Sequence, residues 1–364
     1  MENEQRIRRI GLLTGGGDAP GLNAVIRAVT LTAILQEEWE VVGIRRGFEG
    51  LLHDNPHVVA LTQKRVEGLL PRGGTVLGAA SHNNPRLFEP SENGPIVSKW
   101  AKAQVRRQLD ALAIDALVII GGDGTMTMGQ QFFEAGIPLV GVPKTIDNDL
   151  LVTELTFGFD SALDQATDAL DRLHTTAESH DRVMVMEVMG RNSGWIALHA
   201  GVAGSADVIL IPELPFTLAA IGAKIREQRD AGRLYSIVVV AEGATPAEGD
   251  QLYREFGDER SLGGIGHWLA AQLAESLGVA TRAVVLGHLQ RGGSPSAFDR
   301  NLATMFGASA VRLIAKRKFG YMTALQCGDI VSVPIIDAIG EQKKVSLESK
   351  LVHTAEGLGI SFGI

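Results

Sequence analysis

The stretch from Pro143 to Asp149 gathers a lysine, a hydroxyl and two carboxylates directly after an apolar run. Lys144 can neutralise phosphate charge, and Asp147 and Asp149 are carboxylates two residues apart. One carboxylate of such a pair can hold Mg²⁺ while the other accepts a proton. An exposed turn rich in Asx residues has the same composition. Because two glycine-rich loops accompany the stretch, we interpret it as a site of phosphoryl transfer to a sugar hydroxyl.

Two glycine-rich segments each join an apolar run to a helical pattern. Gly15–Gly21 follows the first run of the chain, and Gly121–Thr125 follows a second. Backbone amides at the start of a helix can bind phosphate through unsatisfied N–H groups and the helix dipole. Asp123 lies inside the second segment, where it can hold Mg²⁺ beside a polyphosphate. For the first segment, a plain strand-to-helix turn explains the sequence equally well.

Several basic residues flank other apolar runs. Arg182 precedes residues 183–188, Arg191 begins a helical pattern, and Arg282, His288 and Arg291 bracket residues 283–286. A single surface arginine is usually only solvated. Several arginines at strand ends in an acidic protein indicate a sugar-phosphate pocket with bidentate phosphate contacts.

Short apolar runs alternate with helical patterns along most of the chain, and this order is typical of βαβ units with mostly parallel sheets. In such sheets ligands bind at the carboxyl ends of the strands. We therefore expect an α/β fold with two lobes, each a mostly parallel sheet flanked by helices. The chemically rich loops follow the apolar runs, so they are expected at those ends.

Composition excludes several classes of function. The 364 residues are 45% hydrophobic and 21% charged, enough for a large core. The net charge of −8 argues against nucleic acid or an anionic membrane as the main partner. The single cysteine, Cys327, excludes an intrachain disulfide and favours a reducing compartment. No apolar run reaches membrane-spanning length. We expect a cytoplasmic protein.

Six motifs in order resemble the 6-phosphofructokinase family, over about residues 7–314. They are Gly-Gly-Asp-Ala-Pro-Gly at 16–21, Gly-Gly-Asp-Gly-Thr at 121–125, Thr-Ile-Asp-Asn-Asp at 145–149, Met-Gly-Arg at 189–191, Ala-Glu-Gly at 241–243 and Gly-His-Leu-Gln-Arg-Gly-Gly at 287–293. The resemblance implies ATP-dependent phosphorylation of fructose 6-phosphate in glycolysis. It also implies a nucleotide-binding lobe at 1–157 and a sugar-phosphate-binding lobe at 158–330, whose last helices could pack on the first lobe. The tail, 331–364, stays unassigned.

The resemblance also implies roles for individual residues. Asp147 would be the general base, and Arg191 and Mg²⁺ would stabilise the transferring phosphoryl group. Asp123 would hold Mg²⁺ with Asp149 near it, and Thr145 would steady the transferring phosphate or the sugar. The implied nucleotide-binding residues are Gly16, Gly17, Gly122, Asp123, Gly124, Thr125 and Lys144. The implied substrate-binding residues are Thr145, Ile146, Asp147, Arg182, Met189, Gly190, Arg191, Glu242, Arg282, His288 and Arg291. In the family, the counterparts of Arg182 and Arg282 reach in from a neighbouring subunit, which implies a homo-oligomer, a dimer or a tetramer, with shared active sites.

The phosphoryl donor is the main question that the resemblance leaves open. Gly124 leaves room for the α-phosphate of ATP, whereas an Asp there goes with pyrophosphate use. Lys144 is typical of pyrophosphate enzymes. An Asp at position 124 would clash with the nucleotide and exclude it, and this chain has no such Asp. The lysine can serve either donor, so we favour ATP. Arg45 and the pair at 81–82 depart from the adenine pocket of bacterial ATP enzymes.

Three alternatives remain: a pyrophosphate-dependent phosphofructokinase, a non-catalytic sugar-phosphate or nucleotide sensor on the same fold, and a Rossmann dehydrogenase. The intact set Asp123, Asp147 and Arg191 argues against a sensor. Thr127 stands where a third fingerprint glycine belongs, which disfavours the dehydrogenase.

Overall fold

The structure is a computed structural model that describes residues 6–80, 86–91, 94–256 and 259–364. Its contacts divide the chain into two units, which we describe separately. The first unit comprises Met1–Ile146, Leu150–Asp160 and Arg291–Glu341. The second comprises Asp147–Asp149, Ser161–Gln290 and Gln342–Ile364. Positions 81 and 82 lie outside the described residues.

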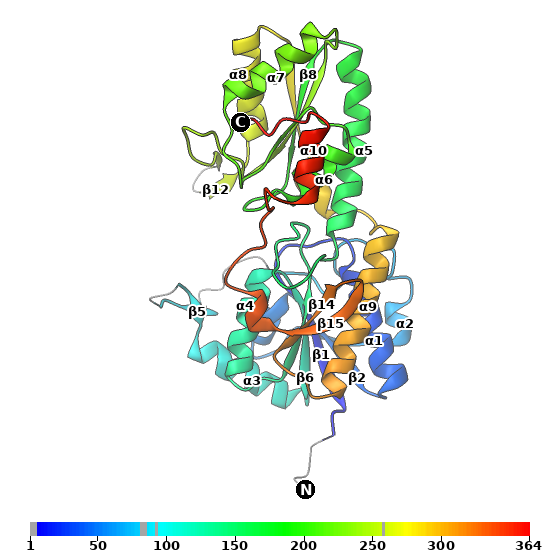
Figure 1. The fold of residues 1–364 in the computed structure, drawn as a ribbon. Coiled ribbons are helices and arrows are strands. Elements are labelled where there is room, and N and C mark those ends of the chain that lie inside the picture. Colours follow the sequence, from blue (N-terminus) through cyan, green and yellow to red (C-terminus); the bar gives the residue numbers. More distant parts are fainter. Residues whose placement is uncertain (1–5, 81–85, 92–93, 257–258) are drawn as a thin grey trace. The chain divides into compact units, whose positions relative to one another are not determined.

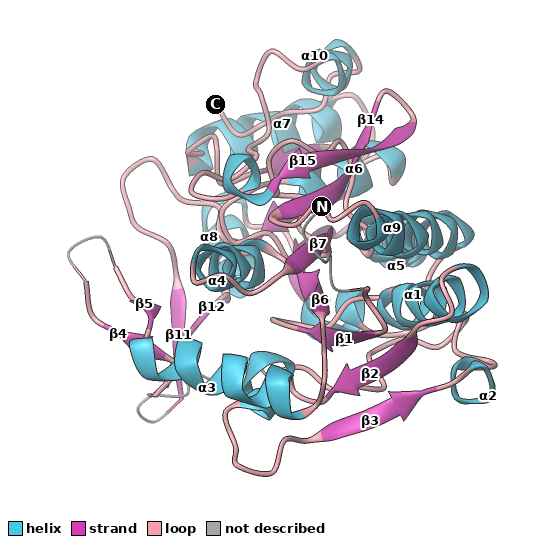
Figure 2. Cartoon of the chain, turned by 90° about the horizontal axis from the view of Figure 1, so that it is seen from below, coloured by secondary structure: helices cyan, strands magenta, loops and turns pink. Residues whose placement is uncertain are grey.

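The first unit is built on a sheet with strand order β15-β14-β7-β6-β1-β2-β3 (Figure 2). The pairs from β14 to β2 are parallel, and β15 and β3 add antiparallel edges. The strands of this unit are β1 (Arg9–Thr14), β2 (Glu40–Ile44), β3 (Val58–Leu61), β4 (Phe88–Glu89), β5 (Ile96–Val97), β6 (Ala116–Gly121), β7 (Leu139–Pro143), β14 (Tyr321–Gln326) and β15 (Asp329–Pro334). Its helices are α1 (Leu22–Gln36), η1 (Gly47–Leu51), α2 (Gln63–Val66), α3 (Lys99–Ala111), α4 (Asp123–Glu134), α9 (Ala297–Ala315) and η3 (Ile335–Ala338).

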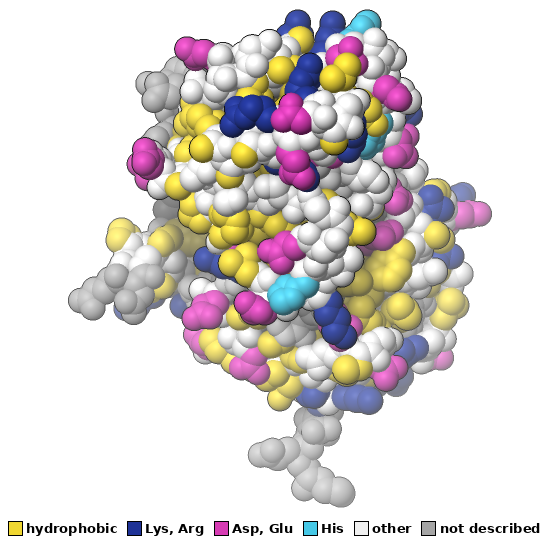
Figure 3. Space-filling model, turned by 45° about the horizontal axis from the view of Figure 1, so that its top comes forward, with side chains coloured by type: hydrophobic (Ala, Val, Ile, Leu, Met, Phe, Trp, Pro, Cys, Tyr) yellow, Lys and Arg dark blue, Asp and Glu magenta, His cyan; other side chains and the backbone are white. Residues whose placement is uncertain are grey.

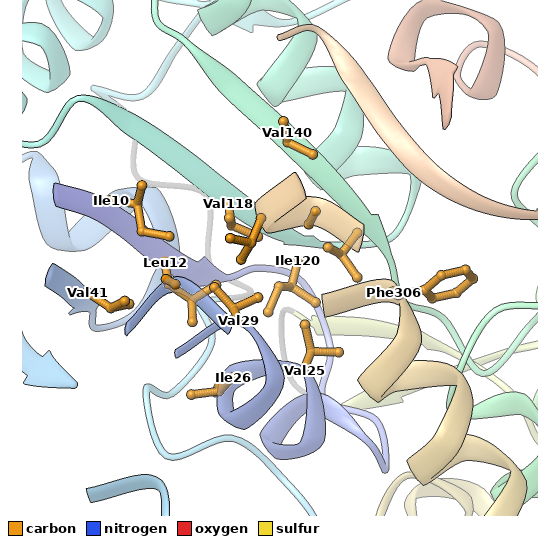
Figure 4. Close-up of a cluster of buried hydrophobic side chains, with 14 of the residues drawn as sticks. Ile10, Leu12, Val25, Ile26, Val29, Val41, Val118, Ile120, Val140 and Phe306 are labelled. Atoms are coloured by element: carbon orange, nitrogen blue, oxygen red, sulfur yellow. The ribbon is translucent and has the colours of Figure 1, made fainter. Parts of the chain in front are cut away.

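Both faces of this sheet are buried, because apolar side chains of the central strands point alternately to one face and to the other. Ile10 and Leu12 of β1 pack with α1 and α9, in the cluster that also contains Val118, Ile120 and Phe306 (Figure 4). The intervening residues of these strands belong to a second cluster, together with side chains of α3 and α4. Because successive side chains of a strand point to opposite faces, helices cover the sheet on both sides. This layering is the α/β architecture that the sequence predicts.

The second unit is built on a smaller, fully parallel sheet with strand order β13-β8-β10-β9. Valines of β8, β9 and β10 pack with α7 and α8 in one buried cluster, and α6 packs against β9 and β10. The elements of this unit are α5 (Phe159–Glu178, whose first two residues belong to the first unit), β8 (Val183–Val188), α6 (Trp195–Ala203), β9 (Val208–Leu210), α7 (Leu218–Asp230), β10 (Ser236–Ala241), β11 (Tyr253–Phe256), β12 (Glu259–Leu262), α8 (Ile265–Leu277), β13 (Thr281–Val285), η2 (Gly287–Arg291, whose last residue belongs to the first unit) and α10 (Lys350–Gly357) (Figure 1).

Two segments lie across the lobe bounds expected at 157 and 330, and that expectation includes packing of the last helices on the first lobe. Helix α9 and strands β14 and β15 lie with the first unit, since α9 packs on α1 and β14 pairs with β7. Residues 342–364 lie with the second unit, where Ser361 forms a bridge to Val208. A helical or strand pattern in the sequence does not say which sheet the element joins, so these assignments need the structure.

The surface carries charges of both signs. Figure 3 shows lysine and arginine side chains interspersed with aspartate and glutamate side chains on the face in view. Mixed charges of this kind are typical of a well-solvated surface. Within the described part of the chain, no helix combines the length and apolar character needed to cross a bilayer.

Candidate functional site

The two glycine-rich loops of the first unit meet around the side chain of Thr125, which is only 2% exposed. A β-carbon on Gly15 would lie 2.6 Å from Thr125 Oγ1, and one on Gly121 would overlap Thr125 Cβ. The backbone N–H of Gly15 also donates to the carbonyl of Ile120 at 2.8 Å. Only glycine fits at these two positions, so the loops after β1 and β6 are held side by side.

The second loop leads directly into α4, and its start is open to solvent. Gly122 is the N-cap, Asp123 is the first helical residue and Gly124 is exposed. A β-carbon on Gly124 would meet nothing within 4 Å. The first amides of a helix have no intrahelical acceptor and carry the positive end of its dipole. This loop therefore offers an anion site with free space beside it.

A cavity of about 390 Å³ lies over these loops. All of the residues predicted to bind nucleotide line it, and so does Thr145. Another part of the wall is apolar and includes Phe48, Phe88 and Met128. The volume falls in the range of about 300–1,000 Å³ typical of small-molecule sites. Polar loops on one part and apolar side chains on another suit a phosphorylated ligand with an aromatic base.

Lys144 brings a third loop, at the carboxyl end of β7, to this cavity. Its side chain is only 3% exposed, and its ammonium donates to the carbonyl oxygen of Gly17. The backbone N–H of Lys144 donates to Gly121 O at 2.9 Å, and Thr156 Oγ1 donates to Thr145 O at 2.7 Å. The lysine charge is thus fixed beside both glycine-rich loops.

Arg291 belongs to the first unit and contacts the same loops. Its Nη1 atom donates to Asp18 O at 3.1 Å and would lie 3.0 Å from a β-carbon on Gly17. Arg291 also lines the cavity. Its implied role in binding the sugar phosphate stays a prediction, and this position adds a second positive charge next to the predicted nucleotide loops.

Sequence reasoning missed part of this wall. Arg46, Gly47 and Phe48 line the cavity and follow β2, so they too stand at the carboxyl end of a parallel strand. The rule that ligands bind at those ends could have found them. The glycine-rich motifs do not indicate them, because this loop carries no such motif.

In the second unit, the loops after β8 and β10 pack backbone against backbone. Gly190 has φ +142°, and a β-carbon on Gly243 would overlap the carbonyl of Arg191. The N–H of Gly243 donates to Gly190 O at 3.1 Å, and the N–H of Glu242 donates to Val188 O at 2.9 Å. This close approach holds Met-Gly-Arg at 189–191 beside Glu242, and the role of these residues in sugar binding stays a prediction.

The predicted base and the turn of His288 join the same group of loops. Ser193 Oγ donates to the carbonyl of Asp147 at 3.2 Å. Gln290, next but one to His288 in η2, accepts at Oε1 from the N–H of Met189 at 2.8 Å. The second unit thus gathers most of the predicted sugar-binding residues around the end of β8.

Arg182 and Arg282 are not brought to this end of the sheet. Arg182 precedes β8, and Arg282 pairs with Met184 near its start. The loop at 189–191 follows the other end of that strand. At about 3.3 Å per residue, the length of β8 separates these arginines from that loop by roughly 20 Å. Within one chain, they therefore do not belong to the same pocket.

The fold is α/β with helices on both faces of the first sheet, and it carries glycine-rich loops suited to anions and an acidic turn after β7. These features are typical of enzymes that act on phosphorylated ligands. Comparison with known proteins narrows this class. The family described as Phosphofructokinase matches residues 9–314. The chain is 53% identical over 359 residues to "ATP-dependent 6-phosphofructokinase" of Chloroflexus aggregans, covering 98% of both chains. The chain belongs to the phosphofructokinase family, and the resemblance drawn from its motifs is confirmed.

Two further relatives frame the question of the phosphoryl donor. "Pyrophosphate--fructose 6-phosphate 1-phosphotransferase" of Amycolatopsis methanolica is 49% identical over 346 residues, with 93% of this chain and 97% of that protein covered. The solved phosphofructokinase of Saccharomyces cerevisiae superimposes with a TM-score of 0.78 at 31% identity. That match covers 91% of this chain, which spans about half (45%) of the yeast chain.

The packing of Thr125 between the glycines can be tested by stability measurements. Gly15→Ala should lower the free energy of unfolding by about 1–3 kcal/mol, because its methyl group meets Thr125. Thr125→Ala removes the two nearest atoms, so the double variant should lose less than the sum of the single variants, by about 0.5 kcal/mol or more. Urea unfolding of the four proteins measures this coupling. Gly124→Ala is the matched control and should change stability by no more than about 0.5 kcal/mol. Strict additivity would contradict the packing argument.

Proposed function

We propose that the chain catalyses ATP-dependent phosphorylation of D-fructose 6-phosphate to fructose 1,6-bisphosphate. The observation that carries this proposal is the open space at Gly124, at the start of α4. This space lies beside the cavity that the predicted nucleotide-binding residues line. A nucleotide needs that space for its α-phosphate, and pyrophosphate does not. The high identity to a relative named for this reaction supports the same conclusion.

In the proposed reaction the 1-hydroxyl oxygen of the sugar attacks the γ-phosphorus, the bond to ADP breaks, and the hydroxyl proton passes to Asp147. Base catalysis of this kind contributes about 10²–10⁴-fold. The remaining acceleration comes from positioning and charge neutralisation, as in other phosphoryl transfers. Lys144 and the amides at the start of α4 face the donor phosphates, and Thr145 and Arg191 stabilise the transferring group.

Asp123 is the residue that would hold Mg²⁺. Magnesium usually binds through one or two carboxylates together with phosphate oxygens and water. Asp123 and Glu49 are the carboxylate residues that line the cavity, and Asp123 is the one that lies in the glycine-rich loop, which fits this kind of binding. The described residues contain no cluster of three metal-ligating side chains. The ion would supply charge neutralisation at the phosphates.

Pyrophosphate dependence is the second candidate function. It is favoured by Lys144, whose ammonium is fixed in the cavity wall, and by the pyrophosphate-dependent name of the Amycolatopsis methanolica relative. We favour ATP because Lys144 can serve the terminal phosphates of either donor, whereas the space at Gly124 has a purpose only with a nucleotide.

The sugar phosphate is proposed to bind at Met189, Gly190, Glu242 and His288. Arg182 and Arg282 stand at the amino ends of β8 and β13, far from these residues along the strands. This position supports the expectation that they serve the pocket of a neighbouring subunit. We therefore propose a homo-oligomer with shared active sites.

The role of Asp147 is tested by Asp147→Asn. This change keeps the size of the side chain but removes its basicity, so kcat should fall about 10²–10⁴-fold. The dissociation constant for fructose 6-phosphate should change by less than about threefold, because binding does not need the base. Steady-state kinetics and calorimetry measure the two quantities. Asp168→Asn, at an exposed position of α5, is the control. Retained turnover would rule out the assignment, and a wild-type protein inactive with both donors would favour the sensor.

The donor is tested by Gly124→Asp. The new carboxylate has room in the protein, so folding should be unaffected, but it would repel the α-phosphate. We expect kcat/KM for ATP to fall about 100-fold or more, since juxtaposed like charges cost several kcal/mol. Gly124→Ala should retain ATP use. Rates with ATP and with pyrophosphate are compared for all three proteins. An unchanged ATP rate would refute the steric argument, and robust wild-type turnover with pyrophosphate alone would favour the second candidate.

Shared active sites predict complementation between two defective variants. Asp147→Asn and Arg282→Ala should each be nearly inactive alone. When they are co-expressed with different affinity tags, hybrid oligomers contain some sites with both residues intact, because symmetry pairs each subunit's Asp147 with its neighbour's Arg282. Purification through both tags should therefore recover activity. Inactive hybrids would show that each site is complete within one chain.

A further inference from the structure

A short segment near the C-terminus, Gln342–Val345, contacts the acidic turn of the second unit. We call this segment the strap. The backbone N–H of Lys343 donates to Asp149 O at 2.8 Å, and its Nζ donates to Asn148 Oδ1 at 3.0 Å. Gln342 Nε2 donates to Asp149 Oδ2 at 3.3 Å. The strap therefore holds the backbone and both side chains that follow the proposed base.

The turn that these bonds hold has an unusual backbone. Asn148 is 2% exposed and has φ +50°, in the left-handed region. Asn tolerates this region better than most residues, but the conformation still needs support from its surroundings. The bond from Lys343 anchors the Asn148 side chain, and so it fixes the turn at the residue next to Asp147.

The same strap also binds the loop that carries Arg191. Trp195, the first residue of α6, donates from Nε1 to Lys343 O at 2.8 Å. The Lys343 ammonium lies 5.5 Å from the centre of the Trp195 ring, within cation–π range. Burial and, second, the nearby charge of Lys343 lower the pKa of His199 in α6.

Glu213 completes the connection on the other side of the strap. Its Oε1 atom accepts from the N–H of Val345 at 2.8 Å and from the N–H of Gly194 at 3.0 Å. Ser193, in the same loop, bonds Asp147 O directly. A closed set of hydrogen bonds thus runs from the acidic turn through the strap to the Arg191 loop and back.

We propose that Lys343 is a positioning residue for phosphoryl transfer, which through Asn148 and Trp195 sets the turn of Asp147 relative to the Arg191 loop. This inference rests on the proposed role of Asp147 as proton acceptor. Lys343 does not touch the reacting atoms in this proposal. Its loss should misplace the base while leaving the sugar-binding residues in place, so the effect should fall on kcat more than on KM.

The test compares Lys343→Met, Lys343→Arg and, as control, Lys344→Met at the exposed neighbouring lysine. Methionine keeps most of the side-chain length without the charge or donors. We expect Lys343→Met to lower kcat by about 10- to 100-fold, the usual cost of misplacing a catalytic group. The KM for fructose 6-phosphate should change by less than about twofold. Lys343→Arg should recover much of kcat, and Lys344→Met should match the wild type.

A double-variant measurement separates this inference from the proposed base. If Lys343 acts through Asp147, then Lys343→Met should cost little further activity in the Asp147→Asn background. A wild-type kcat for Lys343→Met would overturn the inference alone, while activity in Asp147→Asn would overturn the base. If Lys343→Met lowers thermal stability as well as kcat, and Lys343→Arg restores neither, the strap has only a structural role.

Discussion

The side chain of Thr125 occupies the space that β-carbons on Gly15 and Gly121 would need, and the anion-binding edge of the first unit depends on this packing. Neighbouring parallel strands bring the two loops to the same edge, where the N–H of Gly15 donates to Ile120 O. The small, buried, β-branched side chain of Thr125 fills the space between the loops. Lys144 then joins both loops from a third strand through bonds to Gly17 and Gly121. The proposed phosphate chemistry draws on the backbone amides of these loops together with the charge of Lys144.

In the second unit, backbone contacts and not a side chain hold the loops together. There the loops at 189–191 and 241–243 touch through their main chains, and glycine at 190 and 243 permits the contact. The acidic turn is only a few residues from Lys144 in sequence, yet its contacts place it with the second unit. Lys144 and the acidic turn are thus held by different cores.

Much of this arrangement could be predicted from the sequence, because apolar runs followed by glycine give both the strands and the loops after them. The motifs and the family resemblance that they carry also predicted the cavity residues of the two glycine-rich loops and Lys144. They did not give Arg46 and Phe48, whose loop lacks a glycine-rich motif. Nor did they assign α9, since its apolar stripe fits either sheet. The role of the strap could not be predicted from the sequence either. The hydrogen bond from Lys343 to Asn148 joins residues far apart in the chain, and a local sequence pattern carries no information about such pairs.

The position of the strap near the C-terminus has a consequence for folding during translation. The ribosome makes the acidic turn at 147–149 long before it makes residues 342–345. A nascent chain therefore carries the turn without the hydrogen bonds that later hold it, and the first unit also lacks α9 and β14 at that stage. Neither unit is a continuous stretch of sequence: the first needs residues 291–341 and the second needs residues 342–364, so neither can finish folding until nearly the whole chain has been made. Such a chain exposes its unfinished sheet edges during synthesis, when protection by chaperones matters most.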